Sequence, residues 1–154
     1  MENEEFRTRN GYRRQQAGDL TESMEDYLEM LCRLTAARPS VGVNEVAARL
    51  HVRPPSASKM LGKLKEAGLA SFEKYGQVSL TELGREKGRY LLWRHDVLSR
   101  FFRCLNQSGG ELRQVELIEH FLDEETVRNL EKLLERLPGE GDGGGRRPPS
   151  GEDS

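Results

Sequence analysis

The chain has 154 residues and a formal net charge of −2, a length that suits one or two small domains. Hydrophobic residues make up 35% and charged residues 32%, the balance of a helical protein with a modest core. No segment approaches the ~18 apolar residues of a membrane span, and the first residues lack the apolar run of a signal peptide. We therefore expect a cytoplasmic protein with no membrane partner.

The predicted elements follow one another from a mobile arm to a Gly- and Pro-rich disordered tail. They are the arm at 1–20, a helix at 23–37 capped by Ser23, a short helix at 44–50 capped by Asn44, a helix from Pro54 to just before Gly68, a hairpin around the KYGQ turn at 74–77, a helix at 82–105 capped by Thr81, helices at 111–122 and 124–137 with Asp123 as cap, and the tail at 138–154. The two cysteines, Cys32 and Cys104, are far apart in apolar segments, which favours reduced core thiols.

Helix, helix, turn, helix and hairpin follow in the order of a winged helix-turn-helix. The sequence thus predicts a mostly α fold, in which a DNA-binding domain at 21–81 precedes a helical domain at 82–137. The distribution of charged residues supports the division into two domains. Residues 44–80 carry six basic and three acidic side chains, whereas residues 105–137 carry four basic and eight acidic ones. The first segment could face phosphates and the second could hold cations.

The helix that begins near Pro54 is the predicted recognition helix, and the hairpin is the predicted wing. Short polar side chains near the start of such a helix suit base edges, and basic side chains suit phosphates. The predicted DNA contacts are Arg53, Ser56, Ser58, Lys59 and Lys63 from the helix, and Lys74, Tyr75 and Gln77 from the wing. The alternative for each lysine is a solvated surface charge.

The segment VELIEHFL at 115–122 carries Glu116, Glu119 and His120 at positions i, i+3 and i+4. In a continuous helix these side chains share one face, with the apolar residues on the other. Acids crowded on one face repel one another unless a cation neutralises them. A solvated face of an amphipathic helix remains the alternative.

Three further residues extend this pattern. Asp26 and Glu29 share a face of the first helix, and His95 lies beside an apolar face of the long helix. A core histidine with a satisfied hydrogen bond is the simpler interpretation of His95 alone. Together the six residues could hold a pair of divalent ions, and the absence of sulfur favours a hard ion such as Mn²⁺. His51 is excluded because it lies in the turn before the recognition helix.

Five segments together resemble the diphtheria toxin repressor family, and within it the manganese transport regulator branch. They are SMEDYLE, PPSASKMLGKLKEAGL, FEKYGQVSLT, RHDVLSRFF and VELIEHFL, and they span roughly residues 20–137. All six ligand positions of that branch match in identity and order. Iron-sensing members carry a methionine where this chain has Asp26, and they usually add an SH3-like domain that this chain is too short to hold.

The resemblance implies a homodimeric, Mn²⁺-responsive repressor without catalytic residues. It would bind two Mn²⁺ per subunit, with Fe²⁺, Co²⁺ or Cd²⁺ as alternative ions, and a palindromic double-stranded DNA operator that controls manganese uptake and homeostasis genes. Dimer and core contacts are expected, without separating the two roles, from Trp93, Phe101, Phe102, Leu130, Leu133 and Leu134. Two alternatives remain: a winged-helix regulator that responds to Fe²⁺ or to no metal, and a two-metal hydrolase, for which the sequence offers no separate general base.

Overall fold

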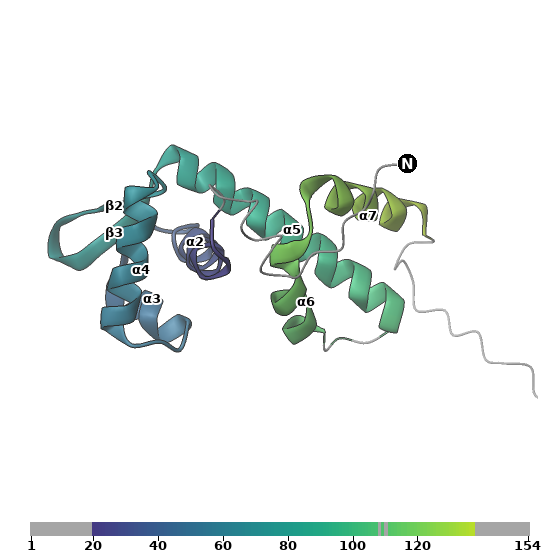
Figure 1. Cartoon of the computed structure of the whole chain (residues 1–154), viewed down its shortest axis with the longest axis horizontal. Coiled ribbons are helices and arrows are strands. Elements are labelled where there is room, and N and C mark those ends of the chain that lie inside the picture. Colours follow the sequence, from purple (N-terminus) through teal and green to yellow (C-terminus); the bar gives the residue numbers. More distant parts are fainter. Residues whose placement is uncertain (1–19, 108, 110, 138–154) are drawn as a thin grey trace, which may run out of the picture. The chain divides into compact units, whose positions relative to one another are not determined.

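The computed structural model describes residues 20–107, 109 and 111–137, which form two compact units that divide between Trp93 and Arg94. The expected tail and all but the last residue of the expected arm lie outside the described residues. Helices dominate both units, and the first adds a small sheet (Figure 1), which confirms the predicted fold class. Within the described residues, no helix is long and apolar enough to cross a membrane.

The first unit has the predicted winged helix-turn-helix order. Its elements are α2 (Glu22–Leu34), β1 (Val41–Gly42), α3 (Val43–Arg49), α4 (Pro54–Glu66), β2 (Ala70–Phe72), the 3-10 turn η1 (Lys74–Gly76), β3 (Gln77–Leu80) and the first part of α5 (Glu82–Asn106). Strands β2 and β3 form the expected hairpin, and β1 adds to it in the order β1-β3-β2, with both pairings antiparallel. The sequence analysis missed β1 because a two-residue strand carries no periodicity.

Two helix starts differ from the predictions. The cap of α2 is Thr21, whose hydroxyl accepts the Met24 N–H at 3.2 Å, so the prediction of Ser23 was wrong. Helix α3 follows Gly42 rather than Asn44, and it has no side-chain cap. In both cases a residue in extended conformation just upstream lets the chain enter the helix earlier.

The core of the first unit joins α2, α3, α4 and the sheet. Leu28, Leu31, Val46, Leu61 and Val78 are fully buried in it. Burial of Leu61 fixes which side of α4 packs on the core and which side is exposed.

The first half of α5 packs tightly against the rest of this unit. A Cβ added at Gly84 would lie 1.9 Å from the carbonyl oxygen of Leu69, and one at Gly88 would lie 2.9 Å from the Cβ of Cys32. Thr81 caps the helix as predicted, with its hydroxyl accepting the Gly84 N–H at 3.0 Å. These contacts explain why the first unit extends into the long helix.

The second unit contains the rest of α5 and three further elements: α6 (Leu112–Ile118), the 3-10 turn η2 (Glu119–Phe121) and α7 (Glu124–Arg136). The prediction of one continuous helix over 111–122 was wrong, because α-helical geometry ends at Ile118. Asp123 caps α7 as predicted, accepting the Thr126 N–H at 2.8 Å.

The cysteines behave differently from each other. Cys32 is partly buried, as expected, and burial raises the pKa of its thiol. Cys104 is exposed, so the expectation of a core thiol was wrong there. Both cysteines are free thiols.

Candidate functional site

The first group of candidate ligands lies on α2. Asp26 is exposed, whereas Glu29 is only 9% exposed. The Arg33 guanidinium, one turn further along, donates to Oε1 of Glu29 from Nη2 at 2.6 Å and from Nε at 3.3 Å. The ion pair thus fixes the orientation of the carboxylate within its own helix.

The second group centres on Glu119, which is 2% exposed. The Nδ1 atom of His95 lies 2.9 Å from Oε2 of Glu119, and both residues belong to the second unit. The imidazole can donate from Nδ1 to this carboxylate, and a cation that replaced the proton would find a nitrogen and an oxygen ligand side by side.

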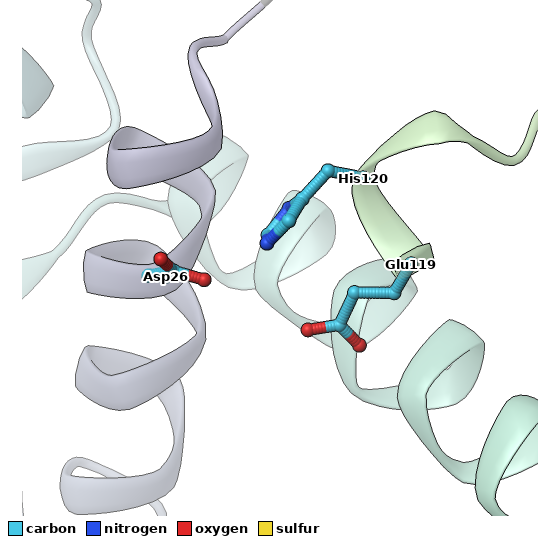
Figure 2. A group of neighbouring side chains, drawn as sticks. All are labelled: Asp26, Glu119 and His120. Atoms are coloured by element: carbon cyan, nitrogen blue, oxygen red, sulfur yellow. The ribbon is translucent and has the colours of Figure 1, made fainter. Parts of the chain in front are cut away.

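His120 follows Glu119 on the same 3-10 turn. Figure 2 shows both side chains leaving η2 toward one side, and Asp26 leaving α2. Nη2 of Arg94, a side chain only 3% exposed, lies 3.5 Å from Nδ1 of His120. A guanidinium cannot accept, so it donates and Nδ1 of His120 is the acceptor.

Glu116 lies apart from this arrangement. It is exposed on α6, whereas Glu119 is buried on η2. The expected common face of Glu116, Glu119 and His120 assumed uninterrupted α-helix, and the change to 3-10 geometry after Ile118 removes that condition. Leu117 on α6 and Phe121 on η2 are also exposed, although both were expected on the apolar face.

The donor set fits a divalent cation. Carboxylate oxygens and imidazole nitrogens suit Mn²⁺, Fe²⁺ and related ions, and the candidate set contains no thiolate or thioether. Burial of Glu119 matters here, because a cation gains most from a carboxylate that water solvates poorly.

The predicted DNA contacts on α4 all lie on its exposed side. Arg53 directly precedes the helix, and Ser56, Ser58, Lys59 and Lys63 are exposed along it, while Ala57, Leu61 and Leu64 are buried. A row of short polar and basic side chains opposite a buried face is what a recognition helix needs.

The wing offers a second group, whose most exposed member is Tyr75. Its side chain is 96% exposed and its backbone has φ 61° and ψ 34°, the left-handed region that a bulky residue rarely adopts. Lys74 is exposed as well. Gln77 is partly buried and accepts the Ser40 hydroxyl at 3.3 Å, so it is less accessible to DNA than its neighbours.

His51 has a structural role in the turn between α3 and α4. It is exposed with φ 54°, a left-handed residue just after a helix end, where glycine is common.

The second unit exposes several large apolar side chains, each at least 39% exposed: Leu105, Leu112, Leu117, Phe121, Leu133 and Leu137. Of the residues expected at core or dimer contacts, Leu133 is in this set, whereas Trp93, Phe101, Phe102, Leu130 and Leu134 are partly buried. Exposed apolar area of this kind marks an interaction surface.

Sequence reasoning missed Arg33 and Arg94. Arg33 follows Glu29 by four residues, a spacing that signals an ion pair on a helix. Nothing in the sequence distinguishes Arg94 from the other arginines, because only its burial and its contact with His120 identify it.

Comparison with known families gives two matches that follow each other along the chain. Residues 19–78 match "Iron dependent repressor, N-terminal DNA binding domain", and residues 81–143 match "Iron dependent repressor, metal binding and dimerisation domain". The HTH-type transcriptional regulator MntR of Geobacillus kaustophilus (strain HTA426) is 35% identical over 116 residues, which cover 75% of this chain and 82% of that protein.

Solved structures show the same similarity. The crystal structure of ScaR with bound Zn²⁺ is 27% identical with a TM-score of 0.62, covering 73% of this chain and 53% of that one. A manganese-dependent transcriptional repressor in complex with manganese is 25% identical with a TM-score of 0.62, covering 71% and 51%. This chain therefore spans about half the length of these two solved chains.

Proposed function

Because the chain belongs to the iron-dependent repressor family, we propose that it is a transcriptional repressor activated by Mn²⁺. That family consists of transcriptional regulators, not enzymes. The observation that carries the choice of metal is the donor set of carboxylates and imidazoles without sulfur, centred on buried Glu119. The similar solved structure of a manganese-dependent transcriptional repressor in complex with manganese supports the same choice.

We assign the ligands to two ions per subunit that share Glu119. The proposed ligands are Asp26 and Glu29 from the first unit, and His95, Glu116, Glu119 and His120 from the second. A carboxylate can serve two ions because it has two oxygens. Glu116 completes the set if α6 extends through η2. Fe²⁺, Co²⁺ and Cd²⁺ have compatible ligand preferences and remain competitors for the site.

The ligands come from both units, and this distribution suggests the mechanism. Asp26 and Glu29 belong to α2 of the DNA-binding unit, whereas His95, Glu119 and His120 belong to the second unit. The bound ions supply positive charge that neutralises the clustered carboxylates. The residues of the two units would then be tied together, and the conformation that fits DNA would gain population.

We further propose that the protein acts as a homodimer on a palindromic operator. A dimerisation domain is part of the matched family, and the exposed apolar side chains of the second unit supply a surface for it. Two recognition helices related by a two-fold axis read two half-sites of inverted sequence. Genes of manganese uptake are the expected targets.

Calorimetric titration of Mn²⁺ into chelator-stripped protein tests this assignment. We expect about two ions per subunit, and fewer in Glu119→Gln, whereas Glu135→Gln on the exposed face of α7 should match the parent. Binding of one ion, or equal binding by the Glu119→Gln variant, would refute the shared two-ion site. DNA binding without any Mn²⁺ binding would indicate a regulator of another signal.

A further inference from the structure

Glu29 and Arg33 form an ion pair within α2. Oε1 of Glu29 accepts from both Nη2 and Nε of Arg33, at 2.6 and 3.3 Å. The Glu29 side chain is 12% exposed and the Arg33 side chain is 46% exposed. A nearly buried carboxylate is thus covered by a guanidinium that reaches it from the solvent side.

A metal ion and this guanidinium would require the same carboxylate. Both Arg33 donors contact Oε1, so an ion on Oε1 would have to displace the guanidinium, and an ion on Oε2 would lie close to its positive charge. The guanidinium therefore opposes the ion electrostatically, and its movement into solvent would relieve that repulsion. Arg33 can move in this way, because almost half of its side chain is already in water and it belongs to no part of the hydrophobic core.

We propose that Arg33 is a tethered competitor of the metal at Glu29 and that it raises the Mn²⁺ concentration at which the site fills. This inference rests on the proposed function, because it requires Glu29 to be a ligand. In the metal-free protein the positive charge of Arg33 neutralises Glu29. This neutralisation reduces the repulsion between Glu29 and the other acids of α2, which include Glu22, Glu25 and Asp26.

The size of the effect follows from the kind of ion pair. Pairs at i and i+4 with one partner in water are weak, so their loss should change metal affinity by about two- to fivefold, which corresponds to about 0.4–1 kcal/mol at 1.4 kcal/mol per tenfold. Such a residue adjusts a response threshold and does not abolish the response.

A matched control exists elsewhere in the chain. Arg128 on α7 donates to Oε1 of Glu124 from Nε and Nη2, with the same i, i+4 spacing, and both side chains are more than half exposed.

The variants Arg33→Gln and Arg128→Gln each remove one positive charge and one ion pair. We expect Arg33→Gln to bind Mn²⁺ two- to fivefold more tightly than the parent, and Arg128→Gln to match the parent. Free Mn²⁺ is measured by electron paramagnetic resonance on full-length, chelator-stripped protein whose fold is checked by circular dichroism.

A double-mutant cycle separates direct competition from a general charge effect. In the Glu29→Gln background, Arg33→Gln should no longer change Mn²⁺ affinity. An equal gain in that background would show a general effect of charge and overturn the proposal. Weaker or unchanged binding by Arg33→Gln alone would overturn it too, because Arg33 would then orient Glu29 or be irrelevant to it. If Glu29→Gln itself binds Mn²⁺ like the parent, Glu29 is not a ligand and the metal assignment fails instead.

Discussion

The Nδ1 atom of His95 lies 2.9 Å from Oε2 of Glu119, and only 2% of Glu119 is exposed. The contact holds an imidazole nitrogen and a carboxylate oxygen side by side, so that one cation could bind both. This pair preorganises part of the proposed metal site within one unit of the chain.

Loss of the Glu119 carboxylate should be the most costly single change at the metal site. We expect Glu119→Gln to lower Mn²⁺ affinity by about 10- to 100-fold, the usual effect of removing a group that orients or holds a metal. Glu116→Gln should cost less, because Glu116 is exposed on α6. Calorimetry of both variants measures this, and a larger loss for Glu116 would mean that metal binding rebuilds the α6–η2 segment.

The exposed basic residues of α4 should contribute through phosphates. Lys63→Ala should weaken binding to all DNA sequences and reduce the slope of log affinity against log salt by about 0.9. Lys132→Ala on α7, also exposed, is the control and should leave the slope unchanged. Ser56→Ala should instead alter the preference among operator variants. Loss of sequence preference in Lys63→Ala with an intact slope would reverse these two assignments.

Tyr75 should have opposite effects on stability and on DNA binding. Its left-handed backbone is unfavourable for a bulky side chain, and at 96% exposure it makes little packing contact. Tyr75→Gly should therefore stabilise the protein by about 0.5–1 kcal/mol while weakening DNA binding. Denaturant unfolding and fluorescence anisotropy measure the two effects. Equal DNA affinity in the variant would remove the wing tip from the interface.

Three glycines should respond differently to alanine. Gly84→Ala should destabilise the protein most, by about 1–3 kcal/mol, because its Cβ would overlap a backbone oxygen. Gly88→Ala should cost less, since its nearest neighbours are side-chain atoms of Cys32. Gly62→Ala in α4 has nothing within 4 Å and should stabilise by about 0.5–1 kcal/mol. Equal stability of all three variants in urea would show that α5 does not pack closely on the first unit.

The sequence predicted what depends on periodicity and on well-defined turns. The buried faces of α2 and α4, the hairpin and the caps at Thr81 and Asp123 follow from local patterns and are confirmed. Strand β1 was missed because it depends on pairing with a distant strand.

The errors at the site have a related cause. The i, i+3, i+4 argument for Glu116, Glu119 and His120 assumed that α6 continues, but its geometry changes to 3-10 after Ile118. Arg94 was missed because burial and a contact across 26 residues are not local patterns. The six-residue metal set remains a prediction, supported by the His95–Glu119 pair.

The most direct test of the account is the metal dependence of DNA binding. A duplex selected from a random library by the Mn²⁺-loaded protein is labelled, and its affinity for chelator-stripped protein is measured by fluorescence anisotropy with and without saturating Mn²⁺. We predict at least tenfold tighter binding with Mn²⁺, within the usual range of allosteric coupling of about 5- to 150-fold, reversal by chelator, and no such gain in Glu119→Gln. Equal affinity with and without Mn²⁺ would contradict the proposal that this chain is a metal-activated repressor.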